Sequence, residues 1–134
     1  MKVVVDTNVF ISAFFFRGPP HRILQAWSEN KLNVVLSPEI LAEYNRAGEE
    51  FSGNAPDPDL RAFLRLLTTK AIIISARPLP SKVCKDPDDD KFLSAALFGG
   101  AKVITSVDKA LLAVSGYRGI EVLRPRDLAD KYIL

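Results

Sequence analysis

The chain has 134 residues and a formal net charge of +2, and 48% of its residues are hydrophobic and 25% charged. This length and composition are typical of a globular domain that buries a sizeable core, and they disfavour disordered and fibrous proteins. The near balance of charge permits a nucleic-acid partner without requiring one. Cys84 is the only cysteine, so no disulfide can form within the chain, and a cytoplasmic protein is the simplest expectation.

No part of the sequence predicts a targeting signal or a membrane segment. The apolar run at residues 9–16 is shorter than the ~20 residues that a membrane-spanning helix needs. The chain also has no internal repeat, low-complexity tract or linker. We therefore expect residues 1–134 to form a single domain without a membrane segment.

Strand-like and helix-like segments alternate along the chain. The β-branched run at residues 3–5 predicts a strand buried on both faces, and further strands are expected at residues 34–36, 71–74, 103–104 and 120–123. Helices are expected at residues 8–16, 21–30, 91–98, 108–114 and 125–132, and others start after Ser37 and Asp57. Residues 48–59 and 78–87 are expected to be loops. This alternation predicts a three-layer α/β/α sandwich with a central parallel sheet of about five strands.

Four acidic residues, far apart in the chain, stand near the ends of expected strands or the starts of expected helices. They are Asp6, Glu43, Asp90 and Asp108. In an open parallel sheet such junctions gather at one edge, where ligands usually bind. Clustered carboxylates repel one another unless a cation neutralises them, and oxygen ligands without nearby Cys or His sets favour Mg²⁺ or Mn²⁺ over zinc. The pattern predicts metal-assisted hydrolysis of a phosphodiester.

Three of these acids also have a purely structural interpretation. Asp6 and Asp108 are favoured residue types for capping the helices that follow them. Glu43 is compatible with the solvated face of an amphipathic helix. Both interpretations stay open for each acid taken alone.

The acidic run at residues 86–90 exceeds what helix capping requires, because one or two carboxylates suffice to offset a helix dipole. We expect Asp90 to be the metal ligand because it directly precedes the apolar stripe of the next helix. Asp88 and Asp89 are expected to be solvated or to support the site from outside.

Neutral and basic side chains near the same edge are candidates for supporting roles. Thr7 and Asn8 offer oxygens that could hold a water molecule or a phosphate. The candidates for gripping a nucleic-acid backbone are Arg17, Arg46, Lys85, Lys91 and Lys109, although each is also compatible with an ordinary solvated charge. His21 is expected at the surface, and residues 14–16, three phenylalanines, in the core or a dimer interface rather than stacked on bases.

Four segments resemble the motifs of the PIN domain family, specifically its VapC-like toxin branch in bacteria and archaea. They are residues 3–9, 37–44, 86–93 and 104–109, and their order and spacing carry the resemblance. The resemblance implies an α/β/α fold and an Mg²⁺- or Mn²⁺-dependent ribonuclease that acts on single-stranded RNA. It further implies a homodimer silenced by a small antitoxin, with Asp6, Glu43, Asp90 and Asp108 as the acidic quartet and Asn8 and Ser106 beside them.

Residues 46–58 depart from the family pattern. Gly48, Gly53 and Pro56 stand where we would expect the preceding helix to continue. The sequence therefore does not define the surface that would recognise RNA or an antitoxin. The acidic positions are unaffected.

Other functions remain to be weighed against a ribonuclease. An aspartyl phosphatase needs a second Asp two positions after Asp6, where this chain has Asn8. A signalling receiver domain would also group carboxylates around a metal. A catalytically silent RNA-binding or interaction module is the main alternative, and the presence of all four acids counts against it. Neither a Walker loop nor a Gly-x-Gly-x-x-Gly element is present.

Overall fold

The computed structural model of the protein describes residues 1–53 and 57–133. Within these residues, five parallel strands form one sheet in the order β3-β2-β1-β4-β5. The strands are β1 (Lys2–Val5), β2 (Asn33–Leu36), β3 (Ile72–Ile73), β4 (Val103–Thr105) and β5 (Glu121–Leu123). The helices are α1 (Thr7–Phe15), α2 (Pro19–Ser28), α3 (Pro38–Phe51), α4 (Pro58–Lys70), α5 (Asp90–Gly99), α6 (Lys109–Leu112) and α7 (Pro125–Tyr132).

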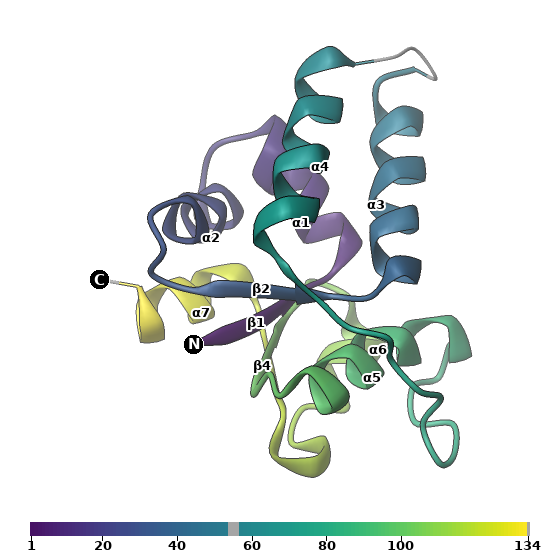
Figure 1. Ribbon diagram of the computed structural model, residues 1–134. Coiled ribbons are helices and arrows are strands. Elements are labelled where there is room, and N and C mark those ends of the chain that lie inside the picture. The colour runs from purple at the N-terminus through teal and green to yellow at the C-terminus, as the bar shows by residue number, and fades with distance from the viewer. Residues whose placement is uncertain (54–56, 134) are drawn as a thin grey trace.

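Helices cover both faces of this sheet. In Figure 1, α1, α3 and α4 stand on one side of the strands, and α5 and α6 lie on the other. Helix α5 packs against β2, β1 and β4, which are the three central strands. The predicted α/β/α architecture with a five-stranded parallel sheet is therefore confirmed.

The central strand fixes where the candidate site lies. Val3, Val4 and Val5 of β1 are buried, as the continuous β-branched run predicted for a strand covered on both faces. Because the strands are parallel, their carboxyl ends meet at one edge of the sheet. Asp6 directly follows β1 at this edge.

The expected loop at residues 48–59 is wrong in its first part, because α3 continues to Phe51. Gly48 is buried within this helix, and a Cβ atom on it would lie 2.3 Å from Leu60 Cδ2 of α4. The glycine thus lets two helices approach closely instead of ending the first one. The supposed departure at residues 46–58 is accordingly an ordinary helix continuation as far as Phe51, and Pro56 lies outside the described residues.

A strap without regular secondary structure, residues 74–86, leads from β3 to α5. Its irregular backbone agrees with the prediction made from its prolines. A 3₁₀ turn, Pro87–Asp89, precedes α5, so the helix begins at Asp90. Gly100 ends α5 with a positive φ of 75°, the conformation that a glycine adopts most easily.

The structure also bears on the expectations for the three phenylalanines and for membrane-spanning helices. Phe14 and Phe15 are partly buried against the core, whereas the side chain of Phe16 is exposed beside Phe51. Among the described helices, none has both the length and the apolar character needed to cross a bilayer.

Candidate active site

Five acidic residues line one pocket of about 340 Å³, which we call the acidic pocket. Its lining comes from the ends of β1 and β4 and from α1, α3 and α5. The lining residues are Asp6, Thr7, Asn8, Glu43, Arg46, Ala47, Glu50, Asp89, Phe92 and Asp108. Three of the four predicted acids, Asp6, Glu43 and Asp108, are therefore brought together.

Asp6 is held firmly at the floor of this pocket. It is the N-cap of α1, and its carboxylate accepts hydrogen bonds from the Thr7 N–H at 2.7 Å and the Ser106 hydroxyl at 2.5 Å. Only 7% of Asp6 is exposed. Burial raises the pKa of Asp6, with smaller contributions from the charges of Asp108 and Glu43, and the two hydrogen bonds oppose this rise.

Asp108 is joined to Asp6 through Ser106. The Asp108 N–H donates to the Ser106 hydroxyl oxygen at 3.0 Å, and that hydroxyl in turn donates to Asp6. Asp108 also caps α6 by accepting from the Ala110 N–H at 3.0 Å. Capping and membership of the acidic pocket thus coexist in Asp6 and Asp108, so the two interpretations left open by the sequence do not exclude each other.

Glu43 reaches the pocket from the second turn of α3. One of its carboxylate oxygens accepts a hydrogen bond from the Thr7 hydroxyl, and the other lies 2.7 Å from the Lys91 ammonium. Lys91 also contacts Asp88 at 3.0 Å, and its side chain is only 12% exposed. Burial opposes the charged form of Lys91, but the Glu43 and Asp88 carboxylates raise its pKa. In this conformation the Lys91 ammonium is therefore paired with the carboxylates of Glu43 and Asp88.

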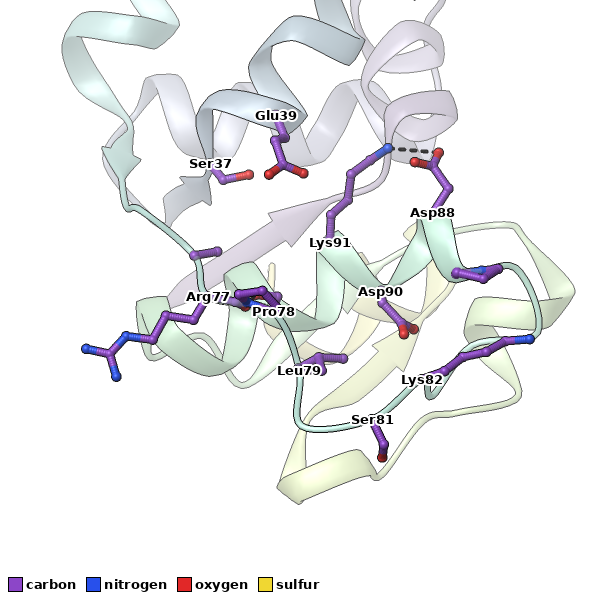
Figure 2. Close-up of a pocket in the computed structure, with 13 residues that line it drawn as sticks. Ser37, Glu39, Arg77, Pro78, Leu79, Ser81, Lys82, Asp88, Asp90 and Lys91 are labelled. Carbon is purple, nitrogen blue, oxygen red and sulfur yellow. Dashed lines mark hydrogen bonds and ion pairs between the residues drawn. The ribbon is translucent and has the colours of Figure 1, made fainter.

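Asp90 does not line the acidic pocket, and its expected placement is corrected. Its two carboxylate oxygens accept hydrogen bonds from the N–H groups of Val83 at 3.0 Å and Cys84 at 2.7 Å, both in the strap. Figure 2 shows the Asp90 carboxylate pointing toward the strap while Lys91 points the opposite way, toward Asp88. Although burial alone would raise it, the two backbone donors lower the pKa of Asp90. Asp90 acts as an anchor for the strap.

Asp89 takes the place that was expected for Asp90. It lines the acidic pocket, and its pKa is raised to about 7 by burial, by a hydrogen bond with Asp108 and by the charges of Asp108 and Asp6. One residue turns a helix by about 100°, so adjacent aspartates point to different sides. Phe92, three residues after Asp89, lines the same pocket, and this spacing is the signal that sequence analysis missed.

Sequence analysis also missed one acid on α3 and the role of a tyrosine. Glu50 lies seven residues after Glu43, on the same helix face, and sequence analysis missed it because that part of α3 was expected to be a loop.

The buried Tyr44 donates its hydroxyl to the Val5 carbonyl oxygen, just before Asp6, and stacks on Phe10 at 4.2 Å. Burial, followed by the charges of Asp6 and Glu43, raises the pKa of Tyr44 well above its ordinary value.

The remaining candidates lie at different distances from the pocket. Asn8 is exposed and lines it together with Arg46, whereas Asp88 is exposed and lines a neighbouring pocket beside the strap. Three of the proposed basic contacts are exposed and do not line the acidic pocket: Arg17, Lys85 and Lys109.

Comparison with known proteins agrees with this geometry. A family model described as "PIN domain" matches residues 2–110. The chain belongs to the PIN domain family. It is also similar to the uncharacterised protein MJ1680 of Methanocaldococcus jannaschii, with 35% identity over 124 residues that cover 85% of this chain and 75% of the relative. The fold is thus that of a nuclease-type domain, and the match spans the segments that carry every acid of the pocket.

PIN domains typically use divalent metals, and the chemistry of the pocket fits such an ion. Its acidic oxygens are hard donors, and the raised pKa values of Asp6 and Asp89, due first to burial and then to neighbouring carboxylates, show that their negative charge is poorly neutralised. Among the described residues, no three acidic, His or Cys side chains are arranged as a finished ion-binding group. Ser106, Thr7 and Lys91 satisfy several of the carboxylate oxygens instead.

Proposed function

We propose that the protein is a metal-dependent endoribonuclease that cleaves single-stranded RNA. The observation that carries the proposal is the acidic pocket, in which carboxylates from four separate chain segments converge at the carboxyl edge of a parallel sheet. Folding that brings so many negative charges together is unfavourable unless a cation, alone or bound to the substrate, neutralises them. Membership of the PIN domain family supports the same chemistry.

Within this proposal, Asp6, Asp89 and Asp108 hold Mg²⁺ or Mn²⁺, and Glu43 completes the acidic set. When bound, the cation acidifies a water molecule and stabilises the charge that develops on the phosphate oxygens. Asp6 is already oriented for this role by Ser106 and the Thr7 N–H. Such outer hydrogen bonds fix the direction of a ligand and tune its affinity.

Substrate binding is assigned to side chains at the rim. Arg46 lines the acidic pocket and is exposed, so its guanidinium is placed to contact a phosphodiester backbone. The exposed Asn8 offers an amide at the same rim. Arg17, Lys85 and Lys109 are proposed to contact RNA only outside the pocket.

The test is an RNA cleavage assay on a mixed pool of single-stranded RNA, with Mn²⁺ or with EDTA, followed by mapping of the new ends. The wild-type protein should cut internally with Mn²⁺ and not in EDTA. Asp6→Asn should remove cleavage and keep the circular dichroism spectrum of the wild type. Cleavage that persists in EDTA, or in a folded Asp6→Asn protein, contradicts the proposal.

A toxin role is a further part of the proposal and rests on the resemblance of the four motifs to the toxin branch. In this role the protein forms a homodimer, and a small antitoxin protein binds the enzyme and silences it. Induction of the wild-type chain in a bacterial host should arrest growth, and induction of Asp6→Asn should not. Equal growth of the two cultures would remove the toxin role and leave the ribonuclease proposal standing.

One observation favours a second candidate, a catalytically silent RNA-binding module. The Lys91 ammonium already neutralises Glu43 at 2.7 Å, which is what a pocket that has lost its metal would show. The same assay separates the candidates, because a silent module binds the RNA pool in a filter-binding experiment without producing new ends.

A further inference from the structure

Lys91 lines the neighbouring pocket beside the strap and reaches the acidic pocket through its contact with Glu43. Its ammonium lies 2.7 Å from Glu43 Oε1, and the Thr7 hydroxyl donates to Oε2 of the same carboxylate. Both oxygens of Glu43 are therefore engaged by the protein itself. A divalent cation bound directly to Oε1, about 2.0–2.6 Å from that oxygen, would have to share it with the Lys91 ammonium, and the two positive charges would repel each other.

The three aspartates that line the acidic pocket have no such counter-charge. Within residues 1–53 and 57–133, Asp6, Asp89 and Asp108 form no ion pair with a basic side chain. Asp6 receives only the neutral donors Thr7 N–H and Ser106 hydroxyl. The negative charge of these three aspartates is therefore available to a cation, whereas that of Glu43 is already paired with Lys91.

Charge balance leads to the same division. With Asp6, Glu43, Asp89 and Asp108 ionised and Lys91 bound to Glu43, the group carries a net charge of −3. One divalent cation leaves −1, and a second would make the group positive. Glu50 and Arg46, the remaining charged residues of the lining, are both exposed and offset each other.

Lys91 also contacts Asp88, which shares part of its charge. The Asp88 side chain is 71% exposed, so water screens that contact far more than the contact with Glu43, whose side chain is 22% exposed. Asp88 therefore holds the end of Lys91 in place without taking over its role in the pocket.

We infer that Lys91 acts as a built-in substitute for a second metal ion, so that the pocket takes one divalent cation, at Asp6, Asp89 and Asp108. This inference rests on the proposed function, since it assigns the number and position of the ions that the nuclease would use. It also changes the role of Lys91 from an RNA contact to a fixed charge of the active site.

The test is the binding stoichiometry of Mn²⁺ alone, measured by calorimetric titration of the metal-free chain, without RNA. The wild type and Lys91→Arg, which keeps the charge, should each bind one Mn²⁺ per chain. Lys91→Met, which keeps most of the length and removes the charge, should bind two. Circular dichroism and a thermal melt of each variant establish that it is folded before it is titrated.

Two results overturn the inference. The wild type binding two ions would do so without any variant, and a folded Lys91→Met binding one ion would do so as well. These failures differ from failure of the proposed function, which would show as no Mn²⁺ binding by the wild type, together with no Mn²⁺-dependent RNA cleavage.

Discussion

Asp89 and Asp90 are consecutive residues, yet their carboxylates face different regions of the molecule. Asp90 meets two backbone N–H donors of the strap, and its pKa is lowered by them against the effect of burial. Asp89 meets the acidic pocket, where burial, Asp108 and Asp6 raise its pKa to about 7. The first carboxylate is satisfied by the fold, whereas the second is left in an environment that disfavours its charge.

This difference is the basis on which we propose a structural role for Asp90 and a functional role for Asp89. Carboxylates that stabilise a fold are given donors or opposite charges, and a perturbed carboxylate in a cleft is a candidate for function. The comparison is useful because the residue type is the same and the two acids are adjacent, Asp89 ending the 3₁₀ turn and Asp90 beginning α5. The matched pair Asp89→Asn and Asp90→Asn therefore removes the same charge at adjacent positions and differs mainly in whether the acidic pocket or the strap loses it.

The largest effect is expected in RNA cleavage by this matched pair. Asp89→Asn should lower kcat/KM by more than about 100-fold, because loss of a metal ligand should exceed the 10–100-fold typical of an outer hydrogen-bond partner. Asp90→Asn should remain within about tenfold of the wild type. The measurement is initial-rate cleavage of one RNA substrate in Mn²⁺. Equal losses in the two variants would show that the distinction between the two sides has no catalytic meaning.

Mn²⁺ should stabilise Asp90→Asn but not Asp89→Asn against unfolding. A ligand that binds only the folded state at 100 times its dissociation constant adds about 2.7 kcal/mol to the free energy of unfolding. Thermal melts should show this gain for the wild type and Asp90→Asn, and little or none for Asp89→Asn. A gain in Asp89→Asn equal to that of the wild type would place the ion elsewhere.

Removal of the strap anchor should cost stability without metal. Asp90→Ala leaves the N–H groups of Val83 and Cys84 without their carboxylate acceptor, and the loss of hydrogen bonds to a charged group should lower the free energy of unfolding by about 1–3 kcal/mol. Urea unfolding in EDTA measures this loss, with Asp88→Ala, an exposed neighbour, as the control. No difference between the two variants would remove the anchoring role of Asp90.

The last expected effect is a pH dependence of stability in EDTA, which water weakens because Asp89 is only partly buried. The pKa of Asp89 is about 7 in the folded state against an ordinary value of 3.8, so the folded protein holds more protons between these pH values. Its free energy of unfolding therefore falls as pH rises from about 4 to about 7. Urea unfolding across this range should show a shallower fall in Asp89→Asn. An unchanged slope in that variant would mean that another group titrates.

The lowered pKa of Asp90 acts in the opposite direction. Its contribution to stability is complete above the ordinary value of 3.8 and is lost as pH falls below that value toward the lowered pKa. The two aspartates therefore dominate different pH ranges, so the measurement on Asp89 is not confused by its neighbour.

Much of the fold follows from local signals in the sequence. The β-branched run of β1, the Ser37 cap followed by Pro38, and the prolines of the strap each specify their own backbone conformation. Asp6 and Asp108 could be placed at the sheet edge because they closely follow strands.

The errors have a different origin, since they depend on contacts between distant segments. Gly48 is helical because α4 packs closely against it at Leu60, and its identity alone suggested a loop. The choice between Asp89 and Asp90 depends on where α5 begins, which the 3₁₀ turn and the strap determine together. Among the four aspartates of this run, only the three-residue spacing to Phe92 distinguishes Asp89.

The position of a bound ion tests the account most directly. Crystals of the wild-type protein soaked in Mn²⁺ would locate the metal by its anomalous scattering. We expect the ion in the acidic pocket, about 2.0–2.6 Å from carboxylate oxygens of Asp6, Asp89 and Asp108, with Asp90 still bound to the strap. An ion coordinated by Asp90, or an acidic pocket without any anomalous peak, would contradict the account.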